Sequence, residues 1–205
     1  EIGLRRRNYH LECRPILQTR TKMCLRSYYA SFNVDSRSLP TYVKFILKLK
    51  AIFEKFGAAG VNQLCLAQGA LESCLGPLYN TTTCIEGSDF AHMFDLDMVT
   101  AKSYATDLQV RHFDCLQKDV FSSNIRCLLN AGKDREDDLK VCLVQLDKSI
   151  KKGEQLCDAF DDYIDCVRNI YVDECGMKVD SFICKAMETS FDFNYGQCKG
   201  KLQKC

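Results

Sequence analysis

The chain has 205 residues, of which 27% are charged and 10% are aromatic, and its formal net charge is +1. No apolar run approaches the length of a membrane span, and no recognisable nucleic-acid-binding module accompanies the basic residues. We therefore expect neither a membrane span nor a nucleic-acid partner. A chain of this length buries about 70% of its unfolded surface on folding, so it can build a core without covalent cross-links.

Apolar residues recur at three- and four-residue steps along most of the chain, and no stretch shows sustained two-residue alternation. This periodicity is typical of amphipathic helices. In chain order it predicts one or two helices over 8–29 interrupted near Pro15, then helices over 40–56, 61–74, 99–120, 125–129, 137–151, 154–175 and 179–187. Asp95 or Asp97 is the expected cap of the helix over 99–120, and Gly57, Gly132 and Gly176 are expected helix ends. We predict an all-α bundle of about six to eight helices, in one domain spanning residues 1–205 with a seam at 132–138.

Cysteine is the most informative residue type in this chain. No two of the cysteines have the two-to-four-residue spacing of paired zinc ligands, and no histidine lies at that spacing from a cysteine. An even number of cysteines without such pairs favours a disulfide framework formed outside the reducing cytosol. We predict seven disulfides among all fourteen: Cys13, Cys24, Cys65, Cys74, Cys84, Cys115, Cys127, Cys142, Cys157, Cys166, Cys175, Cys184, Cys198 and Cys205.

Four of these cysteines, from Cys157 to Cys184, follow one another at intervals of nine residues. Nine residues rotate an α-helix by about 900° and advance it by about 13.5 Å, whereas a disulfide needs Cα atoms about 4.4–6.8 Å apart. Consecutive cysteines on one helix must therefore bond to different neighbours, and such a helix is expected at the centre of the bundle. The connectivity stays open. The shorter series Cys65, Cys74 and Cys84 indicates either an internal duplication or a coincidence of spacing, and we favour coincidence.

Charge is distributed unevenly along the chain. Residues 1–55 hold 12 Lys or Arg against 4 Asp or Glu, while the remainder holds 16 against 23. One interpretation is a basic surface for an anionic partner, such as a glycosaminoglycan or an acidic protein. The alternative, which we favour, is the solvated face of an amphipathic helix. The candidate partner surface comprises Arg5, Arg6, Arg7, Lys44 and Lys48.

Motifs for catalysis are missing from the sequence, which has neither a nucleophile elbow nor a phosphate-binding loop. We predict no enzyme, no cofactor and no metal site. The acidic residues Asp158, Asp161, Asp162 and Asp165 are interpreted as a solvated helix face. Two sets of aromatic residues could line a cavity for an apolar ligand, although such spacing is more typical of a core. These sets are Phe45, Phe53 and Phe56, and Phe113 and Phe121.

Two further sequence features bear on contacts outside the core. Asn80-Thr81-Thr82 is a sequon for N-glycosylation and falls between two expected helices, so we predict a glycan on Asn80 in an exposed loop. Tyr28, Tyr29 and Tyr195 are candidate anchors at an interface.

The stretch CVRNIYVDECG from Cys166 to Gly176, with Cys157 before it and Cys184 after it, resembles the secreted nematode domain known as domain of unknown function nineteen. The spacing of Cys65, Cys74 and Cys84 looks like the upstream element of that family. The cysteine-rich domain of nematode chondroitin proteoglycans is similar enough to be a sibling interpretation. The resemblance covers roughly Cys65 to Cys198. It implies a secreted, disulfide-bonded helical domain with no established enzymatic activity and no defined functional residues beyond the cysteines.

Our functional prediction is a secreted, non-enzymatic protein that binds a protein or a glycan in the extracellular space. The alternative is a carrier of a small apolar ligand in a helical cavity. A weaker third hypothesis is an inhibitor, because disulfide scaffolds present loops at a low entropic cost.

Overall fold

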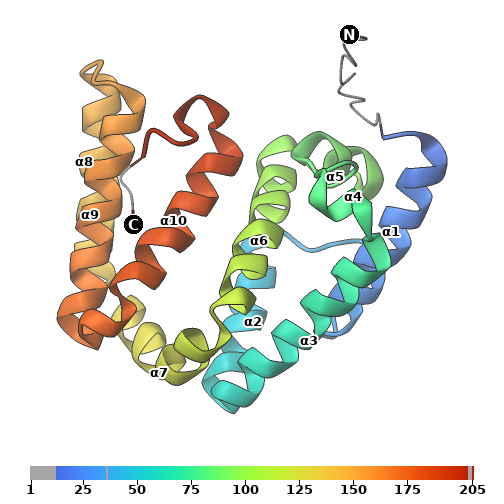
Figure 1. Cartoon of the computed structure of the whole chain (residues 1–205), viewed down its shortest axis with the longest axis horizontal. Coiled ribbons are helices and arrows are strands. Elements are labelled where there is room, and N and C mark those ends of the chain that lie inside the picture. The colour runs from blue at the N-terminus through green and yellow to red at the C-terminus, as the bar shows by residue number, and fades with distance from the viewer. Residues whose placement is uncertain (1–12, 36, 203–204) are drawn as a thin grey trace, which may run out of the picture.

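The computed structural model describes residues 13–35, 37–202 and 205, and within these the chain is all-α (Figure 1). It has ten α-helices, two 3₁₀ turns and no strand in the described part, which confirms the predicted fold class. The elements are α1 (Pro15–Ala30), α2 (Tyr42–Phe56), α3 (Ala58–Leu75), α4 (Pro77–Asn80), α5 (Gly87–Phe94), α6 (Met98–Leu116), α7 (Lys118–Asp134), α8 (Glu136–Lys151), α9 (Leu156–Cys175), η1 (Met177–Val179), α10 (Asp180–Asn194) and η2 (Gly196–Cys198).

The helix count exceeds the expected six to eight because the short helices α4 and α5 have too few residues for a clear periodic pattern. The predicted helix over 99–120 is also divided, since α6 ends before Gln117 and α7 begins after it. Gly132 does not end a helix and lies inside α7. Asp97 is the cap of α6, and its carboxylate accepts a hydrogen bond from the Thr100 backbone nitrogen at 2.9 Å.

Helix α2 places its apolar residues on one side. Phe45, Leu49 and Phe53 recur at four-residue steps and are buried. Gly57 ends the helix with a φ of +53°, which glycine adopts without steric cost, so α3 can begin at the next residue. At Gly60 an added Cβ would lie 3.1 Å from the Ile52 carbonyl oxygen, so a larger residue there would force the start of α3 away from α2.

All fourteen cysteines are paired, which confirms the seven predicted disulfides. Helix α9 carries Cys157, Cys166 and Cys175, and consecutive cysteines bond to different neighbours, as the nine-residue spacing predicted. Its bonds run to α7, to α8 and to η2. The seven pairs are Cys13–Cys84, Cys24–Cys74, Cys65–Cys115, Cys127–Cys175, Cys142–Cys166, Cys157–Cys198 and Cys184–Cys205.

The disulfides form two separate sets, one within 13–115 and one within 127–205. In the first set, cysteine one bonds to cysteine five, two to four and three to six. The same order recurs from Cys127 to Cys198 once the additional pair Cys184–Cys205 is set aside. Six cysteines allow fifteen pairings, and any one of the four pairs of the second set could have been set aside, so agreement by chance is about one in four. This shared order favours internal duplication over the coincidence of spacing that we expected.

No disulfide joins the two sets, so apart from the continuous chain the halves are held together by noncovalent contacts. Helix α6 packs against α10, where Phe113 and Phe182 stack and the Thr106 hydroxyl donates to the Asn194 side-chain oxygen at 3.0 Å. Helix α7 also packs against both α3 and α9, so it bridges the halves along the lower edge of Figure 1. The main buried cluster extends from Cys24 to Ile183 and therefore includes residues of both halves. The predicted seam at 132–138 lies at the junction of α7 and α8, inside the second half.

Candidate functional site

Only part of the predicted partner surface lies within the described residues. Arg5, Arg6 and Arg7 lie outside the described residues. Lys44 and Lys48 lie on α2 and are exposed. Asn80, the predicted glycosylation site, is exposed as the last residue of α4, directly before a turn.

The exposed side of α2 combines lysines with apolar residues, and we call it the α2 outer face: Val43, Lys44, Leu47, Lys48 and Lys55. Val43 and Leu47 are 67% and 59% exposed. Within the described part of the chain, none of the three lysines forms an ion pair; Lys48 donates a hydrogen bond to the Asn33 carbonyl oxygen, and the Lys55 ammonium lies over the Phe56 ring. The face is therefore positively charged and unneutralised by the protein itself.

An apolar groove lies between α2 and α7. Its volume is about 230 Å³, and its walls include Ile46, Leu49, Phe53 and Phe121. Two of the aromatic residues proposed from the sequence thus line a common cavity. Phe45 belongs to the core instead, and Phe56 is exposed. The groove is smaller than the roughly 300–1,000 Å³ of typical small-molecule sites.

A larger and more polar pocket, of about 380 Å³, lies where α6 meets α10, and we call it the α6–α10 pocket. Residues from three helices line it: Tyr42, Val99, Lys102, Ser103, Thr106, Ser190 and Asn194, with Tyr195 directly after α10. The sequence had indicated Tyr195 as a candidate interface anchor, and the structure places it partly exposed at this pocket. The prediction that Tyr28 and Tyr29 are interface anchors is wrong, because both rings are buried in the core.

A buried charge cluster lies beside these cavities. The Arg111 guanidinium donates to Asp107 and to Asp114, with nitrogen–oxygen distances of 2.9 and 2.8 Å, and the Tyr42 hydroxyl donates to Asp107 at 2.9 Å. Burial raises the pKa of Asp114 to about 6, although Arg111 acts in the opposite direction. This cluster was not predicted from the sequence. Its signal was the i, i+4, i+7 spacing of Asp107, Arg111 and Asp114, which puts three charges on one side of α6.

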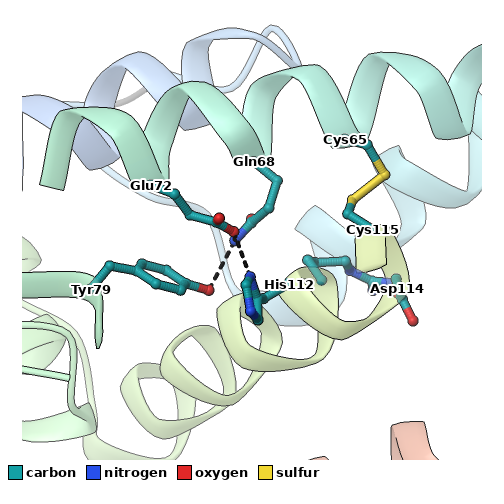
Figure 2. The surroundings of a disulfide bond; sticks show 8 residues. Cys65, Gln68, Glu72, Tyr79, His112, Asp114 and Cys115 are labelled. Atoms are coloured by element: carbon teal, nitrogen blue, oxygen red, sulfur yellow. Dashed lines mark hydrogen bonds and ion pairs between the residues drawn. A yellow bond between two sulfur atoms is a disulfide. The ribbon is translucent and has the colours of Figure 1, made fainter. Parts of the chain in front are cut away.

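A second polar group links α3 to α6 next to the Cys65–Cys115 disulfide (Figure 2). His112 Nδ1 lies 2.7 Å from a Glu72 carboxylate oxygen, and the Gln68 amide donates to both Glu72 and the Tyr79 hydroxyl at 2.9 Å. The Tyr79 hydroxyl donates in turn to the Leu108 carbonyl oxygen at 3.0 Å.

The His112–Glu72 pair has the geometry of an imidazole oriented by a carboxylate. Catalysis of acyl transfer would need a serine, threonine or thiol within reach of the ring. The ring instead contacts the Glu72 carboxylate and the Tyr79 ring, whose centroid lies 5.4 Å from that of the imidazole (Figure 2). Burial raises the pKa of Tyr79 well above its ordinary value, so the phenol stays protonated at neutral pH. The hydrogen bonds of this group connect α3, α4 and α6.

The acidic residues of α9 do not converge. Among the described residues, no group of three or more His, Cys, Asp or Glu side chains is placed to hold a metal ion. Arg168 forms ion pairs with Asp165 and Asp180 at 3.2 and 3.0 Å. None of the described helices is long and apolar enough to cross a lipid bilayer.

Comparison of the chain with protein-family models, curated proteins and solved structures found no match.

Proposed function

We propose that this chain is a secreted, non-enzymatic interaction protein that binds an anionic glycan through the α2 outer face. The observation that carries the proposal is the presence of Lys44, Lys48 and Lys55 on one exposed side of a helix, without an acidic partner among the described residues. Such a face attracts polyanions, and the attraction weakens as salt screens it.

Two features of the fold support this proposal. Seven disulfides are compatible with an oxidising extracellular environment. The second half has no counterpart of α2, because Cys142 and Cys157 are separated only by the end of α8 and a short loop, whereas Cys24 and Cys65 enclose the whole of α2. If the two halves arose by internal duplication, α2 is an addition to the repeated unit. Membership of the nematode family named above remains part of this proposal.

The test is retention on a heparin column at increasing salt. The triple variant Lys44→Glu, Lys48→Glu and Lys55→Glu should elute at clearly lower salt than the unaltered protein. A control variant with the same change of charge carries Lys133→Glu, Lys152→Glu and Lys201→Glu, all exposed and outside α2. Equal retention of the two variants would show that charge alone matters and would overturn the assignment to α2. If the triple variant on α2 keeps its retention on heparin but loses retention on an immobilised acidic protein, the partner is a protein and not a glycan.

The alternative function, a carrier of a small apolar ligand, is favoured by one observation, the groove between α2 and α7. Native mass spectrometry of protein purified from eukaryotic culture medium tests it. A stoichiometric apolar ligand that is released on unfolding would support the carrier, and an empty protein would count against it.

A further inference from the structure

The α6–α10 pocket lies at the contact between the two separately cross-linked halves of the chain. Val99, Lys102 and Thr106 come from the first half, and Ser190, Asn194 and Tyr195 come from the second. Its volume of about 380 Å³ falls within the range of small-molecule sites, and such sites are frequent where two structural units meet.

Several polar groups of the pocket are held in place by the protein. The Tyr42 hydroxyl is bonded to the buried Asp107, and the Thr106 hydroxyl is bonded to the Asn194 side-chain oxygen. One Asn194 amide hydrogen is donated to the Ser190 carbonyl oxygen at 3.0 Å. These bonds fix two walls before any ligand arrives, which lowers the entropic cost of binding.

Other groups lack partners. Within the described part of the chain, no hydrogen bond or ion pair engages the Lys102 ammonium, the Ser190 hydroxyl or the Tyr195 hydroxyl. The Asn194 amide has a second hydrogen to donate. No acidic side chain lines the pocket. The stem of Lys102 lies against Gly87, where an added Cβ would come within 2.6 Å of the Lys102 Cγ atom, so α5 restricts the paths open to this side chain.

We propose that the α6–α10 pocket binds one acidic sugar unit, with its carboxylate on Lys102 and its hydroxyls on Ser190, Asn194 and Tyr195. Sugar hydroxyls both donate and accept hydrogen bonds, and so do the hydroxyl and amide side chains that line this pocket. The rings of Tyr42 and Tyr195 supply apolar surface beside these polar groups.

The composition of the pocket distinguishes this ligand from other small molecules. A phosphate monoester carries a charge of about −1.5 to −2 at neutral pH, whereas this pocket offers one lysine, so a singly charged carboxylate matches it more closely. An apolar ligand would leave the unpartnered polar groups without hydrogen bonds, and this lowers its affinity. The proposal rests on the proposed function in taking the partner to be an anionic glycan, and it adds a second site, whose lining includes none of the lysines of the α2 outer face.

The experiment is a titration of the ¹⁵N-labelled full chain with sodium glucuronate, followed by amide chemical shifts. Glucose and sodium acetate serve as probes of the ring alone and of the charge alone. We expect saturable shifts confined to residues 42, 99–106 and 190–195, with affinity for glucuronate at least about tenfold above that for either control probe. Lys102→Met should reduce the affinity about tenfold or more, and Ser190→Ala and Tyr195→Phe should each reduce it by a smaller factor. Lys118→Met, on an exposed lysine outside the pocket, is the matched control.

Shifts that are absent, or that persist undiminished in Lys102→Met, would overturn the proposal, and so would equal affinity for acetate and glucuronate. Unchanged shifts elsewhere in the spectrum show that each variant is folded. The heparin experiment is independent of this titration. If glucuronate binds while charge reversal on α2 leaves heparin retention intact, the proposed sugar site in the pocket is supported and the proposed glycan surface on α2 is overturned. If heparin retention depends on α2 and glucuronate does not bind, only the proposed sugar site in the pocket is overturned.

Discussion

Phe113 of α6 and Phe182 of α10 stack with their ring centroids 5.7 Å apart, and the contact joins two halves of the chain that share no disulfide. Phe182 also stacks on Phe121 of α7 at 5.5 Å. The buried Phe182 ring thus contacts α6, which is the last helix of the first disulfide set, and α7, which packs against helices of both sets.

Replacing this ring should weaken the association of the halves while every disulfide stays intact. Phe182→Ala should lower the free energy of unfolding by about 3–5 kcal/mol, the usual cost of removing a buried phenylalanine side chain. Denaturation in urea without reductant measures it. Leu116→Ala, at a side chain that is 68% exposed, should change stability by less than about 0.5 kcal/mol. Equal effects of the two substitutions would contradict the packing described.

The separation of the disulfide sets predicts the outcome of a single cut between them. A site for a sequence-specific protease introduced after Gln117, at the break between α6 and α7, would divide the chain between Cys115 and Cys127. The cleaved protein should separate into two pieces on a denaturing gel without reductant, because no disulfide crosses the cut. Pieces that part only after reduction would show a different connectivity.

Asp114 should make the stability of the protein depend on pH. Its pKa is about 6 in the folded protein, against an ordinary value of 3.8, because burial disfavours the charged form. The folded state therefore binds the proton more tightly than the unfolded state. The stabilisation that results is complete below about pH 4 and is lost as the pH rises through about 6, by about 3 kcal/mol in total.

The variant Asp114→Asn isolates this effect, because its amide keeps the shape of the carboxyl group and does not titrate. The difference in unfolding free energy between the variant and the unaltered protein should shift in favour of the variant as the pH rises from 4 to 7. Asp97 gives the stability a pH dependence of the opposite sign, because its hydrogen bonds to Thr100 lower its pKa. This contribution is the same in the variant and in the unaltered protein, so it cancels in the difference. A difference that is constant across this range would contradict the raised pKa.

The sequon makes a prediction about modification. Expressed in a eukaryotic secretory pathway, the protein should carry one N-linked glycan on Asn80, because this side chain is exposed at the end of α4. Intact mass before and after enzymatic deglycosylation measures it. The excess mass should be missing in Asn80→Gln, and a glycan that persists in this variant would place the modification elsewhere.

Several structural features were predictable because they depend on residues close together in the chain. The amphipathic pattern of α2 and the glycine that ends it both lie within one helix length. The nine-residue steps of Cys157, Cys166 and Cys175 predicted that consecutive cysteines bond to different neighbours, and in α9 they do. The break at Gln117 was not predictable in the same way, because apolar residues continue through it without a glycine or proline to mark an end.

The site depended more strongly on contacts between distant residues. Lys44 and Lys48 were predicted on one helix face, and the structure places both there. The α6–α10 pocket was invisible in the sequence, since Lys102 and Ser190 meet only when α6 packs against α10. The pairing of Glu72 with His112 has the same origin, because it joins two helices that are separated by α4 and α5.

The sequence alone determined that this chain is helical and cross-linked, because helical periodicity and cysteine spacing are properties of short stretches. Tertiary structure alone decided which cysteines bond, where the two halves meet and which polar groups face a common pocket. Those outcomes follow from which helices pack side by side, and that choice is made by the burial of side chains across the whole chain at once.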